Sequence, residues 1–133
     1  MSILPWAVLF LVCVNAAFAQ DAAIKVGKEE AAMLASLALS NTGGSFEGEL
    51  SPRSGFYIFQ GVNPDSEREG SVTFGFFAVN PWTGDVWDMW DCGKRFNTPA
   101  LRKAQAVIRK RFTADEAKRY QELRDRYPGC DVG

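Results

Sequence analysis

The feature that most constrains this chain is an apolar segment near its start, because it determines which residues remain to fold and in which compartment. Residues 3–17 are almost uninterruptedly apolar and lead into Ala17-Phe18-Ala19, followed by the polar Gln20 and Asp21. A run of about 15 residues is shorter than the roughly 20 that cross a bilayer, and small residues occupy both positions that define a cleavage site. The pattern predicts a signal peptide over residues 1–19, cleaved after Ala19, with an uncleaved membrane anchor as the alternative.

The predicted export determines what the cysteines are expected to do. Residues 20–133 would form a single α+β domain that retains two of the three cysteines, Cys92 and Cys130. An exported protein folds where thiols can be oxidised, and the chain has neither a Cys-x-x-Cys spacing nor any His to support a redox or nucleophilic thiol. We therefore predict a structural disulfide between Cys92 and Cys130, which would stabilise the domain by up to about 4 kcal/mol.

Hydrophobic periodicity predicts an N-terminal helix and an antiparallel sheet. Apolar residues recur at spacings of three and four over residues 28–39, which is typical of an amphipathic helix. Residues 56–62, 72–79 and 85–91 are rich in aromatic and β-branched residues and are separated by turn sequences. They predict a three-stranded antiparallel meander, with residues 46–50 as a further edge strand.

Two C-terminal helices complete the predicted fold. Thr98 followed by Pro99 is a helix start, and the segment from Thr113 to Glu116 is a capping box that begins the last helix. The side chains expected to face inward from that helix are Ala117, Tyr120, Leu123 and Tyr127. Both helices should pack on one face of the meander, and the disulfide should tie the sheet to them.

Charge is distributed unevenly between the two parts of this domain. Residues 20–91 carry 4 basic and 11 acidic side chains, net −7, whereas residues 92–133 carry 11 basic and 5 acidic, net +6. We expect the basic side chains of the last two helices to be solvated and to neutralise the acidic sheet side in part. They are Arg102, Lys103, Arg109, Lys110, Arg119 and Arg126. An anion or nucleic-acid site is the alternative, but the near-zero net charge and the absence of an interleaved aromatic platform argue against nucleic acid as a partner.

The densest group of chemically distinctive residues is the segment 81–91, which holds three tryptophans and three aspartates. Strand alternation places Trp87 and Trp90 on opposite faces, so at least one of them should fill the core. Trp82 follows Pro81 in a turn, where we expect no core position, and an exposed Trp there could stack on a sugar or contact a protein. Replacing Trp82 with Ala should then weaken binding and leave folding intact. The candidate binding residues are Trp82, Asp85, Trp87, Asp88 and Trp90.

Catalysis and metal binding have weaker support. The absence of His removes the commonest general base and the most frequent transition-metal ligand. A glycosidase needs two carboxylates held across a cleft, and nothing in the sequence selects such a pair. Asp85, Asp88 and Asp91 match no calcium-loop spacing. We therefore expect no catalytic residue, metal or cofactor, with a small carboxylate-dependent hydrolase as an alternative.

One short segment resembles a known family. Val79-Asn80-Pro81-Trp82-Thr83-Gly84-Asp85-Val86-Trp87 is similar to the strand, turn and second strand of PepSY-type exported domains. These are small helix-and-sheet modules whose proposed role is to hold or inhibit peptidases. The resemblance covers about nine residues and brings no catalytic residue with it, so it implies a non-catalytic binding protein.

Together these observations predict a periplasmic or secreted binding protein without a stable membrane anchor. Its expected partner is a protein in the cell envelope or outside the cell, and its expected role is that of an inhibitor or immunity-type module against a secreted or cell-wall-acting enzyme. The first alternative is a carbohydrate or peptidoglycan binder that uses the Trp and Asp side chains of residues 82–91.

The disulfide can be tested directly. Thiol titration of the unreduced, denatured mature protein should detect no free thiol, because Cys92 and Cys130 pair and Cys13 leaves with the signal peptide. Two titratable thiols in the mature chain would disprove the pairing.

Overall fold

The computed structural model describes residues 21–39, 43–63, 72–91 and 93–130. The predicted signal peptide of residues 1–19 lies outside these ranges. Within them, no helix is both long enough and apolar enough to span a membrane.

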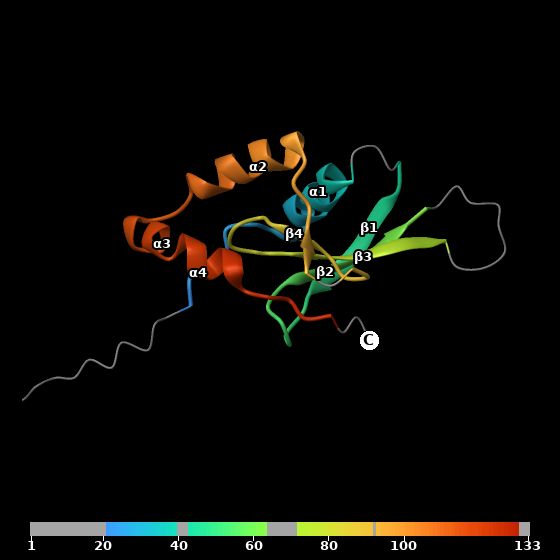
Figure 1. The fold of residues 1–133 in the computed structure, drawn as a ribbon, viewed down its shortest axis with the longest axis horizontal. Coiled ribbons are helices and arrows are strands. Elements are labelled where there is room, and N and C mark those ends of the chain that lie inside the picture. Colours follow the sequence, from blue (N-terminus) through green and yellow to red (C-terminus); the bar gives the residue numbers. More distant parts are fainter. Residues whose placement is uncertain (1–20, 40–42, 64–71, 92, 131–133) are drawn as a thin grey trace, which may run out of the picture.

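Four helices and five strands make up the described residues (Figure 1). The helices are α1 (Lys28–Ala38), α2 (Pro99–Arg109), α3 (Ala114–Lys118) and α4 (Tyr120–Asp125). The strands are β1 (Ser45–Leu50), β2 (Tyr57–Val62), β3 (Thr73–Val79), β4 (Val86–Asp88) and β5 (Lys94–Arg95). They form one antiparallel sheet in chain order. The α+β class is confirmed, whereas the predicted number of three strands is wrong.

The two additional strands have different origins. β1 is the optional edge strand, and it pairs with β2 along its whole length, from Ser45 opposite Val62 to Leu50 opposite Tyr57. β4 is shorter than predicted because the Asp88 carboxylate accepts hydrogen bonds from the backbone N–H groups of the next turn, at 2.9 Å from Trp90 and 3.2 Å from Asp91. An Asp side chain bonded in this way stabilises a turn. The chain therefore leaves the sheet after Asp88 and returns as β5.

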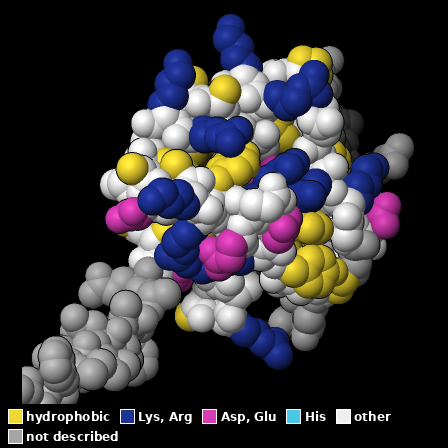
Figure 2. Space-filling model, turned by 60° about the vertical axis from the view of Figure 1, so that its left-hand side comes forward, with side chains coloured by type: hydrophobic (Ala, Val, Ile, Leu, Met, Phe, Trp, Pro, Cys, Tyr) yellow, Lys and Arg dark blue, Asp and Glu magenta, His cyan; other side chains and the backbone are white. Residues whose placement is uncertain are grey.

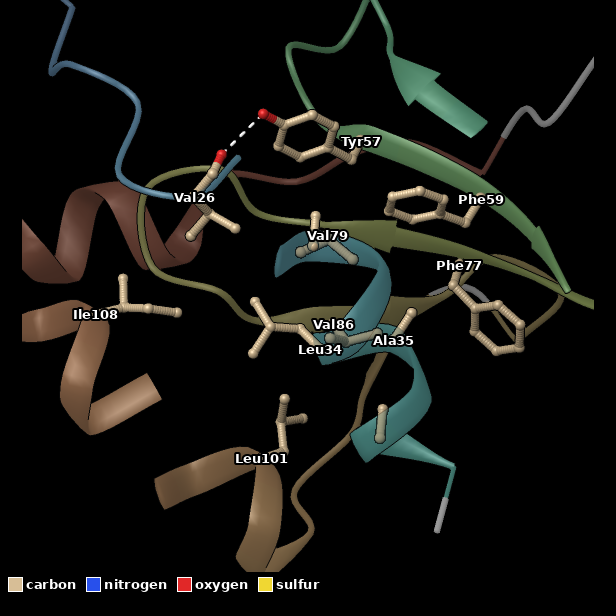
Figure 3. Packing of buried hydrophobic residues seen from close by; sticks show 12 residues of the cluster. Val26, Leu34, Ala35, Tyr57, Phe59, Phe77, Val79, Val86, Leu101 and Ile108 are labelled. Carbon is tan, nitrogen blue, oxygen red and sulfur yellow. Dashed lines mark hydrogen bonds between the residues drawn. The ribbon is translucent and has the colours of Figure 1, made fainter. Parts of the chain in front are cut away.

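The main hydrophobic core lies between one face of the sheet and helices α1 and α2 (Figure 3). Leu34 of α1, Ile108 of α2 and Val79 of β3 belong to this core, and all three side chains are fully or almost fully buried. The hydroxyl of Tyr57 donates a hydrogen bond of 2.8 Å to the carbonyl oxygen of Val26 at the edge of this core. Burial raises the pKa of that hydroxyl, so Tyr57 acts as a neutral donor.

A second, smaller core covers the opposite face of the sheet. Ala78 of β3 and Trp87 of β4 are paired across the strands and point away from the first core, because side chains alternate along a strand. Leu123 of α4 is fully buried against them. The prediction that the C-terminal helices pack on one face is therefore wrong: α2 covers the first face and α4 contributes to the second.

A break in the last helix accounts for this arrangement. Arg119, with φ −93° and ψ 2°, separates α3 from α4, so the predicted continuous helix is two short ones. Of its predicted inward residues only Leu123 is buried, whereas Ala117 and Tyr127 are exposed. The predicted helix starts are confirmed, since the Thr98 hydroxyl accepts from the N–H of Leu101 and Thr113 forms a capping box with Glu116.

The turn between β3 and β4, residues 80–85, is held together by hydrogen bonds of the Asn80 side chain. The Asn80 side chain is fully buried, and its oxygen accepts from the backbone N–H groups of Trp82 at 2.9 Å and Thr83 at 3.0 Å. Its nitrogen donates to the carbonyl oxygen of Leu123 at 2.8 Å. Gly84 closes the turn at φ 78°, and a Cβ there would lie 2.6 Å from the Ile108 side chain, so only glycine fits.

The N-terminal segment before α1 packs along this turn. The backbone N–H groups of Lys25 and Val26 donate to the carbonyl oxygen of Pro81 at 2.9 and 3.1 Å. The Lys25 ammonium lies 2.6 Å from the Glu116 carboxylate of α3. Its hydrogen bond, aided by the Thr113 N–H, lowers the pKa of Glu116 to about 2. The segment thus links the turn to the C-terminal helices.

The predicted Cys92–Cys130 pairing stays a prediction, because Cys92 lies outside the described residues. Cys130 is disulfide-bonded. It also lies 2.6 Å from the Tyr127 hydroxyl, measured from its Sγ.

Replacing Asn80 with Ala should lower the free energy of unfolding by about 3 kcal/mol, because it leaves two N–H groups of the buried turn and the carbonyl group of Leu123 without partners. Urea denaturation of the mature protein measures this loss. The control is Asn63→Ala, at an exposed position, which should change stability by less than about 0.5 kcal/mol. Equal stability of the two variants would contradict the role of Asn80.

Candidate functional site

Trp82 is a core residue, contrary to the expectation that it would be exposed. Its side chain is 6% exposed, the Phe56 ring meets it edge to face at 6.2 Å, and the Arg126 guanidinium lies 4.4 Å from the ring centroid. Its indole N–H donates to the carbonyl oxygen of Ala22 at 2.7 Å. The expectation failed because the turn packs against the N-terminal segment and α4, which are distant in sequence. Trp82 has no free ring face to offer to a ligand.

The carboxylates of the two candidate aspartates, Asp85 and Asp88, also interact with other groups of the chain. Asp85 is 5% exposed, accepts a hydrogen bond of 2.6 Å from the Thr83 hydroxyl and lies 3.6 Å from the Arg124 guanidinium. Asp88 accepts the two backbone hydrogen bonds that end β4. Both carboxylates therefore stabilise local structure.

Trp87 and Trp90 differ in burial, but strand alternation is not the reason, because Trp90 lies beyond the end of β4. Trp87 is 8% exposed, with the Tyr127 ring edge to face at 5.4 Å and the Arg95 guanidinium 5.1 Å from its ring centroid. Its indole N–H has no hydrogen-bond partner among the described residues. Trp90 is 59% exposed and contacts only the edge of Phe76 among the described aromatic rings, at 6.0 Å. Of the five candidate residues, Trp90 is the one that presents a large apolar surface to solvent.

A cleft between α2 and α4 is the feature that the sequence did not predict as a site. It has a volume of about 450 Å³ and is lined by Asn97, Arg102, Gln105, Ala106, Arg109, Tyr120, Gln121 and Arg124. We call it the arginine cleft. Figure 2 shows Lys and Arg side chains gathered on this helical side of the molecule. The sequence signal for this cleft is the net charge of +6 over residues 92–133, which favours a solvated surface and has an anion site as its alternative.

The described residues contain no group of His, Cys, Asp or Glu side chains that could hold a metal ion. The arginine cleft has no carboxylate among its lining residues. The arrangement there offers positive charge and hydrogen-bond donors, which suits recognition of an anionic group.

Comparison with known proteins gives one similar solved structure. The chain matches no protein-family model and no curated protein. It is similar to a chain in the structure of a type VI secretion system effector-immunity complex from Pseudomonas protegens. The two chains are 26% identical and superpose with a TM-score of 0.53, over 74% of this chain and 88% of the other.

The different environments of Trp82 and Trp90 predict opposite effects on stability. Trp82→Ala should lower the free energy of unfolding by about 3 to 5 kcal/mol, since it removes a packed indole and leaves a cavity. Trp90→Ala should lower it by about 1 kcal/mol or less, because most of that side chain is already in water. Chemical denaturation of both variants checks the order. A larger loss for Trp90→Ala would contradict the placement of the two side chains.

Proposed function

We propose that this protein is an immunity-type binding module that inhibits a secreted or cell-wall-acting enzyme in the cell envelope or outside the cell. The observation that carries the proposal is the similarity to a chain of an effector-immunity complex, which extends over most of both chains. A protein that neutralises a toxin by binding needs a stable scaffold and a recognition surface. It needs no catalytic group of its own.

The chemistry of the chain favours the inhibitory role over the toxic one. The sequence has no His. The interior carboxylate Asp85 is held by Thr83 and Arg124, and Glu30 of α1 is held by Arg111, whose hydrogen bond lowers the pKa of Glu30. An acid catalyst requires a raised pKa, and Glu30 and Glu116 are shifted in the opposite direction.

Trp90 is the proposed hydrophobic contact with the partner. It is the most exposed of the large apolar side chains in the described part of the chain, and Trp is enriched among residues that dominate binding energy. The backbone of Trp90 is held by the turn that Asp88 stabilises. Binding therefore costs little backbone entropy at this residue.

Carbohydrate or peptidoglycan binding is the second candidate, and it depends on the same residue. Stacking on a sugar requires an open ring face, which Trp90 offers and Trp82 does not. A single exposed ring is a small platform for a sugar. The protein-binding role is therefore the better supported of the two.

The test begins with isolation of the protein that cross-links to the mature chain in the native envelope. Once this partner is identified, its production alone in bacteria should be toxic. Its production together with this chain should be harmless. Trp90→Ala should weaken the complex by about 2 kcal/mol, measured by titration calorimetry. Met33→Ala, at an exposed apolar position on α1, is the control and should change affinity by less than about 0.5 kcal/mol.

Three results would contradict the proposal. A partner that is equally toxic with and without this chain would exclude an immunity role. Saturable changes in Trp fluorescence on titration with muropeptides, without a protein partner, would favour the carbohydrate alternative. Turnover of a substrate that is lost when one carboxylate is removed would favour the hydrolase.

A further inference from the structure

Two arginines of the arginine cleft are oriented by uncharged partners. One Nη of Arg102 donates to the backbone oxygen of Asn97 at 2.8 Å and to its side-chain oxygen at 3.1 Å. The Arg109 guanidinium lies 4.0 Å from the centroid of the Tyr120 ring. Neither forms an ion pair with a carboxylate among the described residues. By contrast, Arg111 and Arg126 on the neighbouring surface are paired with Glu30 and Asp21. Arg102 and Arg109 thus hold a fixed position with their charge uncompensated.

The remaining walls of the cleft are fixed by the buried turn between β3 and β4. The Gln105 side-chain nitrogen donates to the carbonyl oxygen of Gly84 at 3.1 Å. On the opposite wall, the Arg124 guanidinium lies 3.6 Å from the Asp85 carboxylate. The Arg124 backbone carbonyl oxygen accepts a hydrogen bond of 3.4 Å from the Arg95 guanidinium. Both walls are therefore attached to the same rigid segment. A site organised before binding loses less entropy when a ligand arrives.

We infer that the arginine cleft is the docking site for an acidic segment of the protein partner, with Arg102 and Arg109 as its carboxylate-binding residues. This inference rests on the proposed function for the nature of the partner. Arg102 and Arg109 are seven residues apart on α2, hence on one face of the helix and about 10 Å apart along its axis. This spacing of the two side chains along the helix suits two successive anionic groups, which a peptide with several Asp or Glu side chains carries.

The same geometry disfavours nucleic acid. Single-stranded nucleic acid is bound by basic side chains together with open aromatic faces on which bases stack. Tyr120 is the aromatic residue in the lining of the cleft, and Arg109 covers one face of its ring. Planar carboxylates, in contrast, match the fork of donors on each guanidinium.

The inference can be tested with a defined probe, a capped hexaglutamate peptide, added to the isotopically labelled mature protein and followed by NMR. At low ionic strength the amide signals of Arg102, Gln105, Arg109 and Gln121 should shift saturably. The double variant R102A/R109A should weaken binding by at least about tenfold. The matched control K103A/K110A removes the same charge from α2 and its C-cap, outside the cleft, and should weaken binding by less than about threefold.

Thermal midpoints of both double variants establish that they are folded, and R102Q/R109Q provides a second test in which the hydrophilic surface is retained. Equal losses in the arginine and lysine variants would overturn the inference, because they would indicate a general electrostatic effect. Shifts of amide signals confined to another surface of the protein would also overturn the inference. Inorganic phosphate or hexathymidylate that binds the cleft more tightly than hexaglutamate would overturn the choice of a carboxylate segment.

The failure of this inference can be distinguished from the failure of the proposed function. If R102A/R109A neutralises the toxic partner as well as the wild type does, the docking site is wrong and the immunity role stands. If hexaglutamate binds as expected but no toxic partner is neutralised, the cleft is an acidic-peptide site and the immunity role is wrong.

Discussion

The side chain of Asn80 makes the interaction on which the rest of the structure depends. It is fully buried, it satisfies two backbone N–H groups of its own turn, and it donates to the carbonyl oxygen of Leu123 in α4. That carbonyl belongs to the last turn of a short helix, where no partner exists within the helix. One amide therefore closes the connection between β3 and β4 and fixes α4 against the second face of the sheet. Burying a polar side chain is compatible with a stable fold when its hydrogen bonds are complete, as they are for Asn80.

This turn also explains where binding surfaces can form. It buries Trp82 and Asp85, the residues that looked most like a binding site in the sequence. Through Gly84 and Asp85 it holds Gln105 and Arg124, which line the arginine cleft on opposite walls. The turn is thus a structural element that positions a site on α2 and α4. Trp90 lies beyond the end of β4 and is the one tryptophan of residues 81–91 left in solvent.

Local signals in the sequence predict where helices start, but not the tertiary environment of their side chains. The start of α2 at Thr98 and Pro99 and the capping box at Thr113 depend on hydrogen bonds within four residues, so the pattern alone was sufficient. The early end of β4 depends on the local turn at Asp88, which the strand pattern does not show, and the burial of Trp82 depends on contacts with other segments. Trp82 was misplaced because a Pro-Trp-Thr-Gly turn is normally at the surface, whereas here residues 21–26 and α4 cover it. The arginine cleft was missed because charge alone does not show which arginines lack a carboxylate.

Hydrogen exchange of the mature chain, measured alone and in complex with its purified protein partner, tests the central claim most directly. Binding at the arginine cleft predicts slower exchange at the amides of Leu101–Arg109 in α2 and Tyr120–Asp125 in α4, with α1 and β1 unchanged and the Asn80–Gly84 turn slow in both states. Slower exchange confined to α1 or to the edge strand β1 would contradict it and place the partner on another face of the molecule.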